Sequence, residues 1–211
     1  PYTLAPIPHE NTDTIAWPAG DRIADTIPAG IDMNKLNAVL TQAFADTMPY
    51  KGTFAVAVVY KGQLVAEHYR SDMKPRTKFL SWSMAKSFTN ALVGILVQKG
   101  QLNIDEPLSI DEWQADDRKK ITLSNLMRMN SGLKWNEDYG NSSDVNNMLH
   151  KFGDMANFTA QKPSEFPADS VWVYSSGSTN LVSKIIRNTI GNDAEYFAFP
   201  RYELFNKIGM Y

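Results

Sequence analysis

A serine and a lysine lie three residues apart in the segment 81–87, whose sequence is Ser-Trp-Ser-Met-Ala-Lys-Ser. The segment leads into an apolar run, 88–99, that the sequence predicts to be one helix ending at Gly100. If this helix begins near Ser83, the side chains of Ser83 and Lys86 share one face, because residues i and i+3 are neighbours on a helix. A lysine beside a serine can take the hydroxyl proton and activate the oxygen as a nucleophile, provided that burial or nearby positive charge lowers the lysine pKa.

Apolar residues cover most of the circumference of this predicted helix, and we expect protein to enclose it. A serine at its N-terminus would meet the positive end of the helix dipole and free backbone N–H groups, which stabilise an oxyanion. The predicted buried stripe consists of Met84, Ala85, Phe88, Ala91, Leu92, Ile95 and Leu96, extended by Val93, Gly94 and Val97.

The Ser-x-x-Lys spacing occurs three times, at Ser71–Lys74, Ser83–Lys86 and Ser131–Lys134. A proline follows the first copy, and a glycine follows the serine of the third, so neither is expected to be helical. Only the middle copy enters a predicted helix. A serine ahead of an apolar run is also the ordinary N-cap of a helix, so a structural and a catalytic role for Ser83 both stay open on spacing alone.

A tyrosine, Tyr174, ends the short extended run 170–174 and precedes a helix predicted over 178–188. A phenol near an ammonium group can pass a proton between a serine and a leaving group, because the positive charge lowers the phenol pKa. The alternative is a packed ring with a hydrogen-bonded hydroxyl. The pattern Tyr-x-Ser/Asn also occurs at Tyr69 and Tyr139, so it does not decide between the two roles.

Composition excludes several classes of function. The 211 residues are 43% hydrophobic and 21% charged with a net charge of -2, which is typical of a globular protein and gives nucleic-acid binding no electrostatic support. The chain has no cysteine, which rules out disulfides and thiol chemistry, and no apolar stretch long enough to cross a bilayer. His9, His68 and His150 are too scattered for a metal cluster. The compartment stays open between a periplasmic or secreted location and a cytoplasmic one, of bacterial type.

The elements expected around the candidate residues are one hairpin and several helices. Two β-rich runs, 53–60 and 63–70, flank a Lys61-Gly62 turn and predict an antiparallel hairpin, which must belong to a larger sheet to be stable. The other predicted elements are helices at 32–45 and after Thr122, a polar loop at 134–147, and further helices at 145–158, at 178–188 and opening at Pro200.

Four motifs, taken in order, resemble the serine β-lactamase-like family, which includes class C β-lactamases, DD-peptidases, class VIII carboxylesterases and 6-aminohexanoate-dimer hydrolases. The loop 135–139, Trp-Asn-Glu-Asp-Tyr, resembles the 6-aminohexanoate-dimer hydrolase branch most closely. The resemblance extends over about 53–210. The four motifs are Ser83-x-x-Lys86, Gly-Gln-Leu-Asn-Ile-Asp-Glu-Pro at 100–107, Ile-Thr-Leu-Ser-Asn-Leu with Met-Asn-Ser-Gly-Leu within 121–133, and Tyr-Ser-Ser-Gly at 174–177.

The resemblance implies the β-lactamase/DD-peptidase fold, in which an α/β part with an antiparallel sheet flanked by helices is combined with an all-α region. We expect 1–78 to form the N-terminal part of the α/β domain, with the helix and the hairpin. We expect 79–211 to form a mainly helical region that carries the serine, lysine and tyrosine motifs. The active site would lie in the groove between the two.

Carried over to this sequence, the resemblance implies Ser83 as the acylated nucleophile, Lys86 as its base and Tyr174 as a proton relay. Tyr139 and Ser176 would contact the substrate, and the backbone N–H of Ser83 would supply half of the oxyanion hole. The reaction would be hydrolysis of a small-molecule amide or ester through an acyl-enzyme, without metal or cofactor. The alternative is a catalytically silent binding or scaffold protein that retains the fold.

One departure from the family concerns its third motif, Lys-Thr-Gly or His-x-Gly on a later strand, which has no match after Tyr174. Three further strands and a C-terminal helix of the family fold are also unaccounted for. We therefore expect this chain to be the N-terminal portion of a longer fold, with the remaining part as a separate chain or a further segment. The acyl group stays open among β-lactams, peptides, esters and linear amides.

Overall fold

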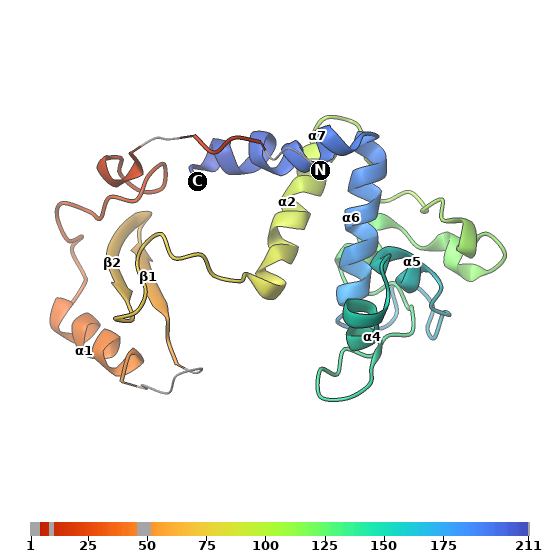
Figure 1. The fold of residues 1–211 in the computed structure, drawn as a ribbon, viewed down its shortest axis with the longest axis horizontal. Coiled ribbons are helices and arrows are strands. Elements are labelled where there is room, and N and C mark those ends of the chain that lie inside the picture. The colour runs from red at the N-terminus through yellow and green to blue at the C-terminus, as the bar shows by residue number, and fades with distance from the viewer. Residues whose placement is uncertain (1–4, 9–10, 46–51, 211) are drawn as a thin grey trace. The chain divides into compact units, whose positions relative to one another are not determined.

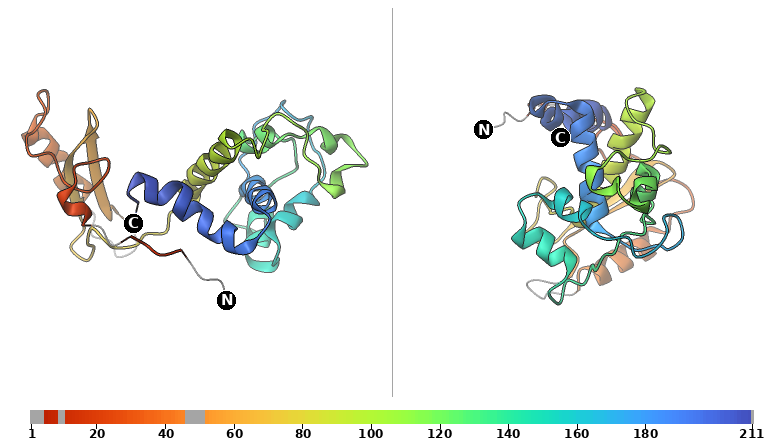
Figure 2. Two further views of the ribbon diagram at one scale, coloured as in Figure 1. Left: turned by 90° about the horizontal axis from the view of Figure 1, so that it is seen from above. Right: turned by 90° about the vertical axis from the view of Figure 1, so that its right-hand side faces the viewer.

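The computed structural model divides into two compact units, which are described separately (Figures 1 and 2). The helical unit comprises Ser81–Leu204 with Pro1–Ala5, and the hairpin unit comprises Pro6–Leu80 with Phe205–Tyr211. The structure describes residues 5–8, 11–45 and 52–210.

The hairpin unit contains the helix α1 (Met33–Ala43) and the two strands β1 (Ala55–Tyr60) and β2 (Gln63–Tyr69). The helix begins after Asp32, whose carboxylate accepts hydrogen bonds from the backbone N–H groups of the second and third helical residues at 3.0 and 3.1 Å. This is a conventional N-cap, because it satisfies donors that have no partner within the helix. The predicted helix start is confirmed.

The predicted antiparallel hairpin is also confirmed, with Tyr60 paired to Gln63 across the turn. Lys61 and Gly62 both have positive φ, at 50° and 76°, as a two-residue hairpin turn of the favoured twist requires. A bulge interrupts the register between Val58 and Val59. Among the described residues the sheet consists of β1 and β2, so the larger sheet that we expected is not formed by them.

The helical unit is organised around one long helix, α6 (Ser176–Ile190), against which the other helices pack. Ser175 caps its start by accepting a hydrogen bond from the N–H of Ser178 at 3.0 Å, and Gly191 ends it in the left-handed conformation at φ 84°. Figure 1 shows α6 between its neighbours. The remaining helices are α2 (Ala85–Gln98), α3 (Leu123–Met127), α4 (Asp144–Lys151), α5 (Met155–Ala160) and α7 (Asp193–Pro200).

The core of this unit surrounds Trp113, which is fully buried and donates its ring N–H to the carbonyl of Ala160 at 2.8 Å. Because that hydrogen bond satisfies the only polar atom of the ring, the whole side chain can be buried without a desolvation penalty. The other members of the core cluster are Val93, Leu96, Ile121, Leu123, Leu126, Leu133, Ala156, Ala160, Leu181, Val182 and Ile186.

The single helix predicted at 145–158 is wrong, because the structure has α4 and α5 with a break between them. Phe152 is extended, at φ -121° and ψ 131°, and Asp154 starts α5 by accepting a hydrogen bond from the N–H of Asn157 at 2.8 Å. Glycine at 153 weakens a continuous helix, and the cap at Asp154 offers the backbone a better alternative.

The helix predicted to open at Pro200 is also wrong, since Pro200 is the last residue of α7. The helix begins earlier, where the side chain of Asn192 accepts a hydrogen bond from the N–H of Glu195 at 2.9 Å. Proline has no backbone N–H, so it interrupts the regular hydrogen-bond ladder. The chain continues from there as a short π-helical turn, Arg201–Phe205.

Candidate active site

The candidate nucleophile Ser83 lies in a 3₁₀ turn, Trp82–Met84, that runs directly into α2. Lys86, in the first turn of α2, has its Nζ 3.1 Å from the Oγ of Ser83. The preceding residue, Trp82, has a φ of 45°, a conformation that is sterically costly for a bulky side chain and that is concentrated at functional sites. The structure therefore brings the predicted serine and lysine into hydrogen-bond contact.

The amine of Lys86 also contacts the start of α6, ninety residues further along the chain. Its Nζ donates to the Oγ of Ser176 at 3.1 Å, and it lies 4.9 Å from the centre of the Tyr174 ring. The packing of α2 against α6 makes these contacts possible (Figure 1). Ser83, Tyr174 and Ser176 thus surround the amine of Lys86, although the role of each residue stays a prediction.

The expected enclosure of α2 is wrong for the described residues. Only Val93 and Leu96 of this helix are buried, whereas Met84 is 65% exposed and Ser83 is also exposed. Within the helical unit, one face of α2 packs against α6, so an apolar residue on another face stays accessible. Lys86 is half-buried and close to hydroxyl groups, which is a more polar environment than the sequence predicts.

The carboxylate of Glu137 is a part of this site that the sequence analysis missed. Its Oε1 accepts from the Ser176 hydroxyl at 2.5 Å and from the Tyr139 hydroxyl at 2.8 Å. Its Oε2 accepts from the backbone N–H of Ser176 at 3.0 Å and from the ring N–H of Trp135. The sequence does not reveal the role of Glu137, because its partner Ser176 lies 39 residues away. In the sequence, Glu137 is only an acidic residue in a polar loop.

Two opposing effects act on the pKa of Glu137. Burial raises it, but the hydrogen bonds from Ser176, Trp135 and Tyr139 to the charged form together outweigh burial and lower it. Glu137 is therefore a carboxylate at neutral pH. An ionised carboxylate can only accept hydrogen bonds, which matches its four donors.

The glycine at 177 allows Trp135 to pack close to the start of α6 and to donate to Glu137. A Cβ atom at that position would lie 2.6 Å from the ring of Trp135 and 2.6 Å from the Oγ1 of Thr159, closer than real contacts allow. The indole therefore packs directly on the first turn of α6. From there its ring N–H reaches Glu137, which in turn reaches Ser176.

The loop 136–145 that carries Glu137 is closed at its base by two hydrogen bonds. The N–H of Val145 donates to the carbonyl of Asn136 at 3.2 Å, and the N–H of Asn136 donates to a carboxylate oxygen of Asp144 at 2.9 Å. Tyr139 lies in this loop and is 55% exposed. Burial and the hydrogen bond to the Glu137 carboxylate raise the pKa of Tyr139, so its hydroxyl is a neutral donor.

The segment before Tyr174 is held in place by backbone hydrogen bonds to the turn after α3. The N–H of Val173 donates to the carbonyl of Met129 at 2.8 Å, and the N–H of Asp169 donates to the carbonyl of Asn130, also at 2.8 Å. Met129 adopts a φ of 59°, which turns the chain at this point. Tyr174 is thus positioned by a segment more than forty residues earlier in the chain.

The two other Ser-x-x-Lys copies do not form part of the site. Ser71 lies in a turn after β2, and Ser131 lies in the loop after α3, where its Oγ accepts from the N–H of Leu133 at 3.4 Å. The prediction that only the middle copy enters a helix is confirmed. In the described ranges, no three histidine or acidic side chains are grouped as metal ligands, and no helix combines the length and apolar character needed to cross a membrane.

A family model, Beta-lactamase, matches residues 42–211. The chain therefore belongs to the β-lactamase family, as the four motifs predict, and the predicted fold class is confirmed.

Two solved structures share the fold. The first, "Putative 6-aminohexanoate-dimer hydrolase from Bacillus anthracis", is 22% identical, with a TM-score of 0.61 over 98% of this chain and 53% of that one. The second, "Crystal structure of putative beta-lactamase from Bacteroides dorei DSM 17855", is 16% identical, with a TM-score of 0.63 over 85% of this chain and 52% of that one. The chain spans about half the length of the solved structures that it matches.

Proposed function

We propose that the chain carries the nucleophile, base and proton relay of a serine hydrolase that cleaves an amide or ester through an acyl-enzyme. Ser83 is the nucleophile, Lys86 its base and Tyr174 the relay. The observation that carries this proposal is the 3.1 Å distance between the Nζ of Lys86 and the Oγ of Ser83. That distance is within reach for direct proton transfer between a base and a nucleophile.

In the first half of the reaction, neutral Lys86 takes the hydroxyl proton as the Oγ of Ser83 bonds to the acyl carbon. The carbonyl oxygen becomes an oxyanion, which the backbone N–H of Ser83 helps to stabilise. The bond to the leaving group then breaks, and Tyr174 returns a proton from Lys86 to the leaving group. In the second half, water bonds to the acyl carbon of the ester on Ser83, and the bond from that carbon to the Oγ breaks. One proton of the water returns to the Oγ, and the acid is released.

The substrate belongs to the class of small-molecule amides and esters. We propose that Tyr139 and Ser176 contact it, because both lie at the same site and present hydroxyl groups. The solved relative that is named as a 6-aminohexanoate-dimer hydrolase makes a linear amide dimer a substrate to test. A panel of nitrocefin, short p-nitrophenyl esters and a linear amide dimer would rank β-lactam, ester and amide as acyl donors.

The nucleophile can be tested with a fluorophosphonate probe on the native protein. We expect stoichiometric labelling, and we expect Ser83→Ala to reduce the labelling rate at least about 1,000-fold, because removal of a nucleophile eliminates the covalent step. Peptide mapping of the labelled protein would locate the adduct on Ser83.

The matched controls are Ser71→Ala and Ser131→Ala, which remove the serines of the two other copies of the motif and should retain labelling. Circular dichroism would verify that each variant is folded. Absence of labelling in the native protein would contradict the proposal and favour the catalytically silent relative.

A further inference from the structure

Two hydroxyl groups lie beside the amine of Lys86, and each can donate a hydrogen bond to it or accept one from it. The inference drawn from this geometry rests on the proposed function. A neutral amine has two N–H donors and one lone pair, and it can act as the base for Ser83 only if the lone pair faces that hydroxyl. Lys86 has two hydroxyl neighbours, Ser83 and Ser176, each 3.1 Å away. A base with its lone pair on the wrong neighbour cannot accept the Ser83 proton.

The hydroxyl of Ser176 has one hydrogen to donate, and two acceptor lone pairs. Glu137 accepts from that hydroxyl at 2.5 Å and holds the backbone N–H of the same residue at 3.0 Å. Because a carboxylate has no hydrogen to give, the hydrogen of Ser176 must point to Glu137. Ser176 therefore offers Lys86 only lone pairs, and it can only accept from the amine.

We infer that Glu137 is a positioning residue that acts through Ser176 to direct the lone pair of Lys86 to the hydroxyl of Ser83. One N–H of the neutral amine is committed to Ser176. With that bond fixed, the lone pair can turn to the Oγ of Ser83 and accept its proton as the oxygen attacks the acyl carbon. Glu137 itself gains no proton in this step.

The alternative is that Glu137 is the final proton acceptor, reached from Lys86 through the hydroxyl of Ser176. Its four hydrogen bonds argue against this, because each of them stabilises the charged form and weakens Glu137 as a base. A second alternative is that Glu137 only fastens the loop 136–145 to α6. The second alternative and the inference differ in whether the effect of Glu137 on the reaction requires the hydroxyl of Ser176.

A double-mutant cycle separates the second alternative from the inference. The acylation rate constant would be measured with the fluorophosphonate probe and with p-nitrophenyl acetate for the native protein, Glu137→Gln, Ser176→Ala and the double variant. Glutamine can turn its NH₂ to Ser176, so that the hydroxyl donates to Lys86 and occupies its lone pair. We expect each single variant to slow acylation about 10- to 100-fold, the effect of a hydrogen bond to a charged group.

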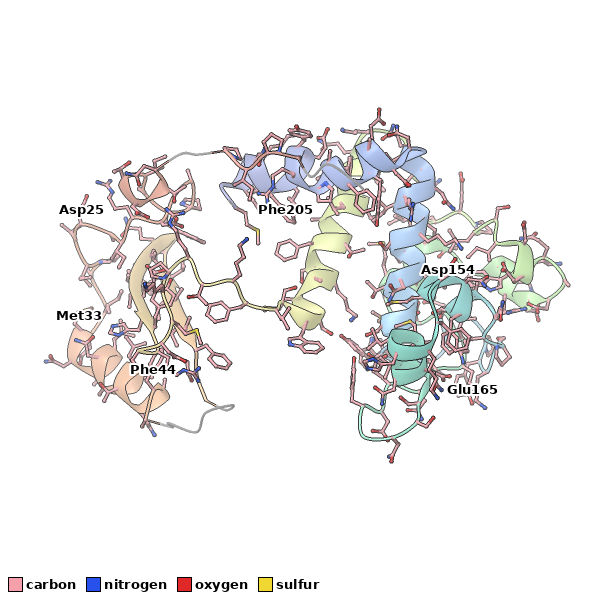
Figure 3. The ribbon with its side chains drawn as sticks, in the orientation of Figure 1. Asp25, Met33, Phe44, Asp154, Glu165 and Phe205 are labelled. Carbon is pink, nitrogen blue, oxygen red and sulfur yellow. The ribbon has the colours of Figure 1, made fainter. Side chains whose placement is uncertain are left out.

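In the double variant we expect no further loss beyond the slower single variant, because both changes break the same link. Glu165→Gln is the matched control, since it is the same chemical change on an exposed residue of the loop that follows α5 (labelled in Figure 3), and it should leave the rate unchanged. Thermal unfolding would be measured for every variant. Ser176→Ala leaves Glu137 its hydrogen bonds from Trp135, Tyr139 and the backbone, so the loop should stay folded in that variant.

Multiplicative effects in the double variant would overturn the inference, because Glu137 would then act without Ser176. An unchanged rate in either Glu137→Gln or Ser176→Ala would also overturn it. Failure of the proposed function gives a different result, in which the native protein shows no acylation that depends on Ser83, and the inference falls with it.

Discussion

The helical unit and the hairpin unit differ in how much apolar surface they bury. Among the described residues, fifteen hydrophobic side chains of the helical unit are buried, compared with four of the hairpin unit. The four are Leu40, Leu64, Val65 and Ala66. A two-stranded hairpin with one helix has little core of its own, and isolated hairpins of this kind are marginal in water.

The difference shows which unit supports the candidate site. Every contact described among Ser83, Lys86, Ser176 and Glu137 lies within the helical unit. Reactive groups must be held within a fraction of an ångström of their working geometry, and packed elements do this better than exposed ones. The core around Trp113 and α6, whose buried members all belong to the helical unit, supplies that rigidity.

The largest expected effect tests the difference between the two cores. Trp113→Ala should lower the free energy of unfolding by about 3–5 kcal/mol, because it leaves a large cavity and removes one of the two donors to the carbonyl of Ala160. Leu64→Ala in the hairpin should cost about 2 kcal/mol, at the low end for such a substitution, because only four hydrophobic side chains are buried among the described residues of that unit. Urea denaturation followed by circular dichroism measures both. Equal losses of unfolding free energy in the two variants would contradict the stated difference between the cores of the two units.

A glycine in each unit provides the second test. Gly177→Ala should destabilise the protein by about 1–3 kcal/mol, because the added methyl group meets the ring of Trp135, and it should also slow labelling of Ser83 by displacing Glu137. Native labelling in this variant would show that the site tolerates movement of the indole.

Gly62→Ala is the control for that test. A Cβ at this position in the hairpin turn meets nothing within 4 Å, so the cost is the left-handed backbone at φ 76°, about 1–2 kcal/mol. Labelling of Ser83 should be unaffected. Hydrogen exchange would place the loss of protection in β1 and β2 for Gly62→Ala, and at the start of α6 for Gly177→Ala.

The smallest expected effect concerns Asp154, which caps α5 and forms an ion pair with Lys184 of α6 at 3.2 Å (Figure 3). The backbone N–H of Asn157 is the main cause that holds the pKa of Asp154 below its ordinary value of 3.8. A carboxyl whose pKa is lower in the folded state stabilises the fold above its ordinary pKa, and this contribution is lost as the pH falls through the folded value.

Asp154→Asn keeps an N-capping side chain and removes the charge. We expect it to cost less than about 1 kcal/mol at pH 7, as for other exposed ion pairs. The difference from the native protein should disappear as the pH falls below the native pKa of Asp154. Unfolding midpoints measured from pH 7 to pH 2 would test this, and a difference that persists at pH 2 would contradict it.

The sequence predicted the features that depend on local pattern. The hairpin follows from two β-rich runs around Lys61-Gly62, and the contact between Ser83 and Lys86 follows from helical spacing. The sequence did not predict the place of Glu137, because the partners of its carboxylate come together only when the loop 136–145 packs on α6. The burial of α2 was overestimated for a related reason, since an apolar stripe does not show which of its faces another element will cover.

The closed base of the loop 136–145 has a consequence for how this protein could be altered. Two hydrogen bonds between its ends hold the loop shut, and its exposed tip at 140–142 carries no contact to Lys86 or Ser83. Lengthening a loop whose ends are already held together has a small entropic cost. Residues inserted at the tip would therefore vary the surface beside Glu137 and Tyr139, while the helices keep their places. This loop is the natural point at which to diversify a library of variants.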